Sequence, residues 1–222
     1  KCRNLNLGTG RPKIAVPITG KTTAEILAAV APIKAAQPDL VEWRIDFFDS
    51  VTDVAALQAT GQQLRAALGE IALLTTFRTK GEGGELVLSD PAYFQVCDAV
   101  LAGHFTDALD VERYHDETAV KQLVAAAHQA KVVVIMSNHD FDKTPAAADI
   151  VARLTSMVAF GADIAKMAVM PQSVDDVLTL LTATNTARQQ LAQPVITMSM
   201  GDLGIVSRLA GEVVGSCLSF AT

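Results

Sequence analysis

One lysine stands out because its neighbours along the chain are apolar. Lys166 lies within the run 162–170, among alanine, isoleucine, methionine and valine. An amine withdrawn from water holds its proton less firmly, and a neutral amine can attack a ketone to form an imine. The alternative is a lysine near a strand end that extends its ammonium group to solvent. Because the apolar run continues beyond Lys166, we favour the nucleophile.

His139 is the second residue whose position suggests chemistry. It follows the apolar run 132–136 closely and precedes Asp140. An imidazole titrates near neutral pH, so histidine is the commonest general acid or base. Asn, His and Asp are also common in turns, so a structural loop histidine is the alternative. The other three histidines lie at a helix end, in a polar loop and in an alanine-rich helix, and we expect no chemistry from them: His104, His115 and His128.

Three carboxylates fall near the ends of other apolar runs. Glu82 lies in the glycine-rich segment 78–85, where it could orient an imidazole or be a solvated loop residue; the segment lacks the ending of a phosphate-binding P-loop. Asp110 and Glu112 alternate along a predicted strand and therefore face the same way. Without a well-placed second histidine or a further acidic cluster beside them, we favour structural hydrogen bonds over a metal site.

The segments that must position these residues alternate between two types. Apolar runs typical of strands buried on both faces occur at 14–18, 40–45, 71–77, 108–111, 132–136, 164–170, 195–200 and 213–220. Helical patterns occur at 22–37, 52–68, 90–102, 116–130, 146–160, 173–191 and 205–210. Strands that alternate with helices predict an α/β fold. About eight strands favour a closed (β/α)8 TIM-type barrel, with a doubly wound open sheet as the alternative.

The barrel prediction extends over the whole chain. No linker, repeat or change of composition divides it, so we expect one catalytic barrel domain over 1–222. The segment 2–11 is expected to form an N-terminal hairpin that closes the bottom of the barrel. The last strand-like run ends at Phe220, so we expect the C-terminal loop and last helix of a complete barrel to be absent from this chain.

Polar residues gather at one end of this predicted barrel. In such folds the catalytic groups lie at the carboxyl ends of the strands. Besides Lys166 and His139, that rim would carry Glu42, Arg44, Arg78, Glu82, Asp110, Glu112 and Arg208. This concentration on one rim favours an active site more strongly than any single residue does.

Composition excludes several other classes of protein. The 222 residues are 50% hydrophobic and 19% charged with a net charge of -6, which excludes a disordered chain. The sequence has no basic cluster, so we expect no nucleic-acid partner. Its apolar runs are too short to span a bilayer and its start resembles no secretory signal, so we expect no membrane partner. Three widely spaced cysteines favour a reducing, cytoplasmic location.

Several motifs, in this order, resemble the type I 3-dehydroquinate dehydratases (type I 3-dehydroquinases). They are EWR at 42–44, TFR at 76–78, EGGE at 82–85, SNHDF at 137–141, KMA at 166–168, MPQS at 170–173, VITMSM at 195–200 and RLAGE at 208–212. The resemblance covers nearly the entire chain, and the SNHDF and RLAGE segments are the most specific.

The resemblance implies a lyase that converts 3-dehydroquinate to 3-dehydroshikimate, the third step of the shikimate pathway of aromatic amino acid biosynthesis. It implies a Schiff base on Lys166, proton transfer by His139 and a carboxylate at Glu82 that orients the histidine, with no metal or cofactor. Substrate contacts are implied at Glu42, Arg44, Arg78, Met198, Met200, Arg208 and Phe220. It also implies a homodimer. Family members continue past Phe220 into a loop that folds over the substrate, so we expect impaired activity from the chain as it stands.

Two other functions remain as alternatives. A class I aldolase or transaldolase shares the barrel and the lysine imine, but such enzymes often have a phosphate site, and SNHDF is not one of their motifs. A barrel that lacks its last segment could also bind a ligand or partner without turnover. Turnover of 3-dehydroquinate separates both alternatives from the dehydratase.

Overall fold

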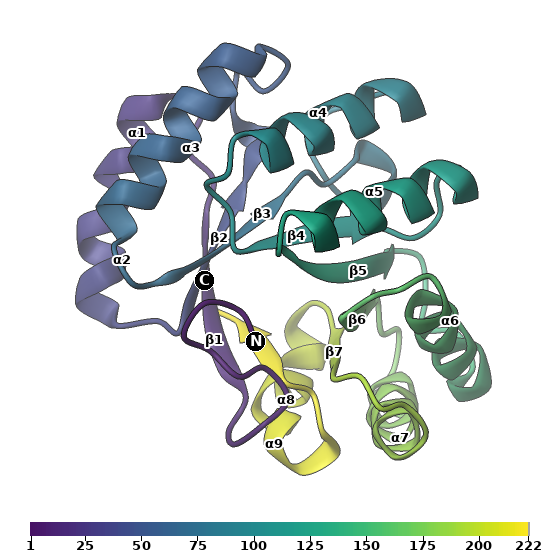
Figure 1. The fold of residues 1–222 in the computed structure, drawn as a ribbon. Coiled ribbons are helices and arrows are strands. Elements are labelled where there is room, and N and C mark those ends of the chain that lie inside the picture. The colour runs from purple at the N-terminus through teal and green to yellow at the C-terminus, as the bar shows by residue number, and fades with distance from the viewer. Residues whose placement is uncertain (222) are drawn as a thin grey trace.

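The computed structural model describes residues 1–221, and within them eight strands form one continuous parallel sheet (Figure 1). Their order is β7-β6-β5-β4-β3-β2-β1-β8, and each neighbouring pair is parallel. The strands are β1 Lys13–Ile18, β2 Leu40–Arg44, β3 Ala72–Thr76, β4 Ala108–Glu112, β5 Val133–Asp140, β6 Ile164–Val169, β7 Val195–Ser199 and β8 Leu218–Phe220.

The sheet nearly closes into a barrel between its two end strands. A parallel bridge joins Val195 of β7 to Ser216, and the backbone N–H of Cys217 donates to the carbonyl of Val195 at 2.8 Å. At the other end of the order, β8 pairs with β1. The predicted (β/α)8 barrel is therefore confirmed, and the open doubly wound sheet is excluded.

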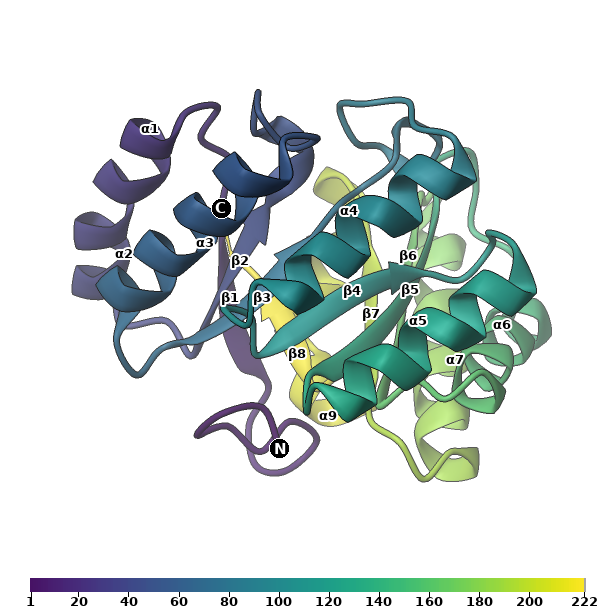
Figure 2. The same cartoon turned by 45° about the horizontal axis from the view of Figure 1, so that its top comes forward.

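Helices surround this barrel on the outside (Figure 2). They are α1 Thr23–Ala28, α2 Val30–Ala36, α3 Val54–Leu68, α4 Asp90–Ala102, α5 Glu117–Gln129, α6 Ala147–Ala159, α7 Val174–Gln190, α8 Ile205–Leu209 and α9 Gly211–Val214. Three short 3-10 helices, η1 Ile45–Phe47, η2 Lys80–Glu82 and η3 Asp202–Gly204, follow β2, β3 and β7. Within residues 1–221, no helix is long and apolar enough to cross a membrane.

Three local predictions differ from the structure. The helix expected at 22–37 divides at Ala29, because Pro32 has no N–H to bond the carbonyl four residues earlier. The strand expected at 213–220 begins only at Leu218: its valines belong to α9, which ends at Gly215 with φ +101°. The N-terminal hairpin is reduced to one bridge between Cys2 and Leu5.

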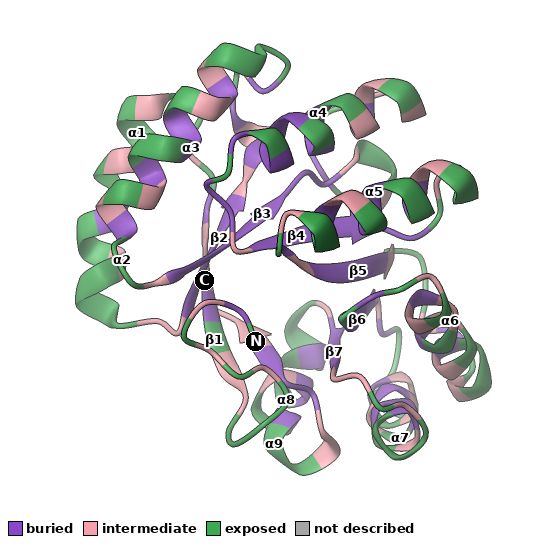
Figure 3. Ribbon diagram, viewed as in Figure 1, coloured by how far each residue is buried: buried purple, intermediate pink, exposed green. Residues whose placement is uncertain are grey.

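The core has two layers because side chains alternate along each strand. One layer lies between the sheet and the helices, and it includes Trp43 and Leu73. The other fills the barrel, where Leu40, Leu74 and Ile135 are fully buried and the N-terminal segment packs against it through Leu5 and Leu7. Figure 3 shows the strands coloured mostly as buried.

The same alternation points the polar residues into the barrel. Two residues beyond the inward-facing Leu40 comes Glu42, and two beyond Ile164 comes Lys166. Likewise Asp110 follows the inward-facing Ala108. The apolar bottom of the barrel therefore gives way to a charged layer at the carboxyl ends of the strands.

Candidate active site

A cavity of about 240 Å³ lies at the carboxyl ends of the strands. It is lined by the predicted site residues Glu42, Arg44, Arg78, His139, Lys166, Met198, Arg208 and Phe220, together with Pro17, Thr19 and Ala221. These residues come from β1, β2, β5, β6, β7 and β8, from the segments that follow β1, β3 and β8, and from α8. Of the predicted set, Glu82 and Met200 do not line the cavity.

Lys166 is buried and ion-paired. Its side chain is 5% exposed, and Nζ lies 3.3 Å from Oδ2 of Asp110. Burial alone would raise the pKa of Asp110, but the Arg78 guanidinium and the Lys166 ammonium outweigh it and lower the pKa of that carboxyl. On its other side, Lys166 Nζ lies 4.6 Å from the ring centre of Phe220, a cation–π distance. The amine is therefore held within the cavity.

His139 is held by Glu82, which lies just behind the cavity wall. Nδ1 of His139 lies 2.9 Å from Oε2 of Glu82, which also accepts the backbone N–H of His139 at 3.1 Å. The side-chain amide of Asn138 donates to Oε1 at 3.1 Å. With Nδ1 engaged by Glu82, the imidazole has Nε2 left for chemistry.

Burial shifts both members of this pair toward their uncharged forms. It lowers the pKa of His139 well below 6.5, and the cations Arg78, Lys166 and Arg44 add to that effect. It raises the pKa of Glu82 to about 7, assisted by the Glu112 carboxylate and opposed by Arg78. His139 is therefore a neutral imidazole at neutral pH, as a general base must be.

Arg78 lies between several carboxylates and is almost wholly buried. Nη2 lies 2.9 Å from Asp110, and Nη1 donates to Glu112 at 2.9 Å and to the hydroxyl of Ser137 at 3.0 Å. Nη1 also lies 3.7 Å from Glu82. Burial alone would lower the pKa of this guanidinium, but Asp110 and Glu112 outweigh it and raise the pKa. Arg78 thus connects the lysine partner and the histidine partner.

Arg44 is oriented by a residue that the sequence analysis did not single out. Its Nε and Nη2 each donate at 2.8 Å to the carboxylate of Asp46, which is buried in η1. Asp46 also accepts the backbone N–H groups of Arg78 and Glu85 at 3.3 Å. Asp46 follows Arg44 by only two residues, and this spacing could have indicated an ion pair. Only the tight turn of η1 shows that the two side chains meet.

The remaining predicted residues differ in their surroundings. Glu42 is 5% exposed and accepts the hydroxyl proton of Thr76 at 2.8 Å. Arg208 donates to the backbone carbonyl of Phe220 at 2.9 Å. Met198 is buried at the cavity wall, whereas Met200 packs partly buried against the inner core. The structure thus brings only the first of the two methionines to the cavity.

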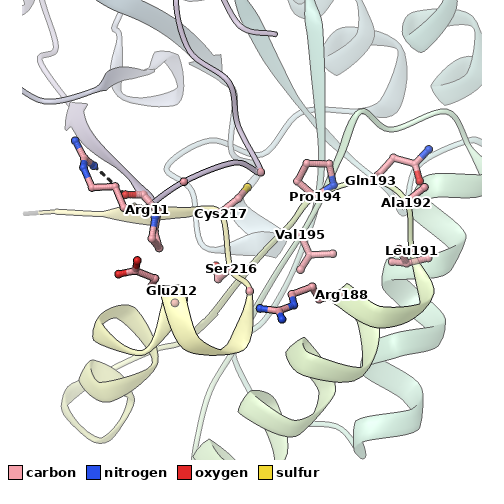
Figure 4. Close-up of a pocket in the computed structure, with 15 residues that line it drawn as sticks. Arg11, Arg188, Leu191, Ala192, Gln193, Pro194, Val195, Glu212, Ser216 and Cys217 are labelled. Carbon is pink, nitrogen blue, oxygen red and sulfur yellow. Dashed lines mark hydrogen bonds between the residues drawn. The ribbon is translucent and has the colours of Figure 1, made fainter.

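A larger hollow of about 380 Å³ lies at the other end of the barrel (Figure 4). Its lining includes Pro194 and Cys217, which come just before β7 and β8, so it opens at the amino ends of these strands. Its charged side chains include Arg188 of α7 and Glu212 of α9. None of the predicted site residues lines it, and we assign it no catalytic role.

Comparison with known proteins identifies the family. The family model described as type I 3-dehydroquinase matches residues 14–222. The chain belongs to the type I 3-dehydroquinase family. The predicted resemblance is confirmed, and the chain is a lyase of the hydro-lyase class.

Curated 3-dehydroquinate dehydratases and solved structures of such enzymes match nearly the whole of this type I 3-dehydroquinase chain. The 3-dehydroquinate dehydratase of Lactiplantibacillus plantarum is 77% identical over 222 residues, which are 100% of this chain and 88% of the relative. That of Listeria innocua is 49% identical over 218 residues, 98% of this chain and 86% of the relative. The structure of the type I enzyme from Clostridium difficile, with covalently modified comenic acid, has a TM-score of 0.97 at 42% identity and covers 100% of this chain and 87% of that one. The structure of the Enterococcus faecalis enzyme has a TM-score of 0.96 at 42% identity and covers 99% of this chain and 92% of that one.

Proposed function

We propose that this chain dehydrates 3-dehydroquinate to 3-dehydroshikimate through an imine on Lys166. The observation that carries the proposal is a buried amine and a neutral imidazole in one cavity, with arginines beside them for an anionic substrate. Membership of the family and the names of its close relatives support this substrate.

The first step joins Lys166 to the ketone. The ammonium gives up one proton, and the freed nitrogen lone pair forms a bond to the carbonyl carbon as the C–O double bond opens. That proton and a second one from the nitrogen pass to the carbonyl oxygen, which leaves as water. The product is a protonated imine, whose positive charge makes a proton on the adjacent carbon acidic. Asp110, 3.3 Å from the amine, is placed to stabilise that charge.

The second step eliminates the hydroxyl group. Nε2 of His139 removes the acidic proton, and the electron pair forms an enamine. The enamine expels the hydroxyl group from the next carbon, and the imidazolium donates the proton that lets it leave as water. Hydrolysis of the product imine consumes one water and frees Lys166, so the net change is the loss of one water from the substrate. Glu82 holds the imidazole in place throughout.

Arg208 is suited to the substrate carboxylate. Arg44 is bound by Asp46, and Arg78 by Asp110 and Glu112, whereas Arg208 bonds a backbone carbonyl and has no carboxylate partner within residues 1–221. A guanidinium without a carboxylate partner can donate two parallel N–H hydrogen bonds to an incoming carboxylate. We therefore assign Arg208 to substrate binding, with Glu42, Met198 and Phe220 as further contacts.

The direct test is turnover. We expect the chain to produce the conjugated enone chromophore from 3-dehydroquinate and to leave a panel of sugar phosphates unchanged. Cleavage of a sugar phosphate would favour the aldolase alternative. Binding of 3-dehydroquinate by calorimetry without the chromophore would favour the non-enzymatic barrel.

We also propose that a family-like C-terminal extension increases the stability and activity of this 222-residue chain. A groove of about 420 Å³ runs between β1 and α2, and its wall includes Ile14, Val16 and Ile33. A helix in this groove would remove apolar surface from water, and a loop over the cavity would exclude water from the imine. Equal melting temperature and equal kcat/KM with and without the extension would contradict this proposal.

Three further proposals concern the assembly, the location and the domain organisation of the protein. We propose a homodimer, by family membership, which sedimentation at micromolar concentration would test. We propose a cytoplasmic location, supported by three cysteines that are buried and make no disulfide within residues 1–221. Finally, we propose that residues 1–222 are one catalytic domain, which a single cooperative unfolding transition would support.

A further inference from the structure

His115 lies between two carboxylates at the outer side of the charged layer. Its Nδ1 is 2.7 Å from Oδ1 of Asp90, in α4, and its Nε2 is 3.0 Å from Oε2 of Glu112, in β4. A neutral imidazole carries one N–H and could satisfy only one of these acceptors. An imidazolium, with both nitrogens donating, satisfies both acceptors. The ring also stacks on Tyr93, with centres 4.2 Å apart.

Glu112 connects this imidazolium to the candidate active site. One carboxylate oxygen accepts from Nη1 of Arg78 at 2.9 Å and from the backbone N–H of Thr79 at 2.8 Å. The other accepts from the Thr79 hydroxyl at 2.8 Å and faces His115. Because Arg78 also lies 3.7 Å from Glu82, a continuous line of charges leads from His115 to the carboxylate that holds His139.

The charges around His115 agree with the protonated form. Tyr93 and Asp90 face it from α4 and Glu112 from β4. Asp116, the residue just before α5, donates its backbone N–H to Asp90 at 3.0 Å. Burial alone would lower the pKa of His115, but the hydrogen bonds and charges of Glu112 and Asp90 outweigh it and raise the pKa.

We propose that His115 is a positioning residue for the dehydration, holding Glu112 on Arg78 and partly neutralising the negative charge that acts on Glu82 and His139. The inference rests on the proposed function. Without the imidazolium, Asp90 and Glu112 are two uncompensated carboxylates, and a more negative surrounding favours the protonated forms of Glu82 and His139. The base His139 would then be blocked by protonation at a higher pH.

The test compares pH profiles of kcat/KM for wild type, His115→Gln and a matched control, His128→Gln. His128 also pairs with a carboxylate, Asp163 at 3.0 Å, but on the surface and away from the cavity. We expect the acid limb of His115→Gln to move to higher pH by a few tenths of a unit or more, the size expected when one charge is removed from a buried cluster. The control should retain the wild-type limb. An unchanged or lower limb in His115→Gln would overturn the inference.

A second measurement separates this inference from the proposed function and does not require that His115→Gln folds. NMR titration of the histidines should place the pKa of His115 above 6.5 in the wild type. Because coupling between sites is reciprocal, Glu82→Gln should lower the pKa of His115. A pKa at or below 6.5, or one unmoved by Glu82→Gln, would overturn the link. Absence of turnover in the wild type would instead contradict the proposed function, and the titration would still decide the link.

Discussion

Nζ of Lys166 lies 3.3 Å from Oδ2 of Asp110, and both side chains are almost wholly buried. The side chain of Lys166 thus forms an ion pair inside the barrel, and the Arg78 guanidinium pairs with the same carboxylate. Asp110 is therefore the shared carboxylate partner of two buried cations.

Asp110→Asn should therefore destabilise the protein and alter Lys166. Removing one partner from a buried ion pair costs about 3–5 kcal/mol, because the remaining charges lose their compensation. Reductive trapping of an imine on Lys166 should also become weaker, because Nζ loses the carboxylate that holds it in the cavity. Thermal melts and trapping from pH 5 to 8 would test this. A variant with the wild-type melting temperature and the wild-type trapping profile would show that the pair is unimportant.

Glu82 should make stability depend on pH near neutrality. Its pKa in the folded protein is raised from 4.5 to about 7, so folding favours its protonated form. Its contribution to stability is fully present below about pH 4.5 and is lost as pH rises through about 7. The wild type should thus lose stability relative to Glu82→Gln between pH 5 and 8. The variant should also turn over substrate more slowly, because the hydrogen bond that orients His139 is weaker.

The matched control for Glu82 is Glu212→Gln, an exposed glutamate in α9. Denaturant unfolding at both pH values measures the differences. The free energy of unfolding of Glu212→Gln should differ from that of the wild type by the same amount at pH 5 and pH 8. If the difference between wild type and Glu82→Gln is also the same at both pH values, the raised pKa of Glu82 is wrong.

Arg208 should affect substrate binding more than the chemical step. Its assigned role is the substrate carboxylate, and a hydrogen bond to a charged group is worth about 1.5–3 kcal/mol. Arg208→Ala should accordingly raise KM by roughly ten- to hundredfold, with a smaller effect on kcat. Arg188→Ala, at the opposite end of the barrel, is the control and should leave both constants unchanged. A large fall in kcat with normal KM would assign Arg208 a different role.

The sequence allowed the barrel and most of the cavity lining to be predicted, because alternation of apolar strands and helices is a local pattern. The partners of those residues were harder to predict. The sequence indicates a polar loop residue at His115, yet this side chain bridges Glu112 and Asp90, which lies 25 residues earlier. Contacts of this kind depend on which strands are adjacent, and a single sequence does not reveal them. The error at α9 has a local cause: Val213 and Val214 suggested a strand, and Gly215 allowed the helix to end there.

The proposed mechanism depends most on covalent attachment of the substrate to Lys166, which is the one buried lysine within residues 1–221. Borohydride reduction in the presence of 3-dehydroquinate would fix any imine as a stable amine. His139→Ala should retain the ability to form this adduct while turnover falls by ~10²–10⁴-fold, the usual contribution of a positioned acid or base. Near-normal turnover in His139→Ala would show that His139 has only a structural role.

The most direct measurement is therefore the intact mass and peptide map of the protein after incubation with 3-dehydroquinate and borohydride. The imine mechanism predicts a single added mass located on Lys166. In Lys166→Ala both this adduct and turnover should be absent. An adduct on another lysine, or turnover without any adduct, would contradict the imine mechanism.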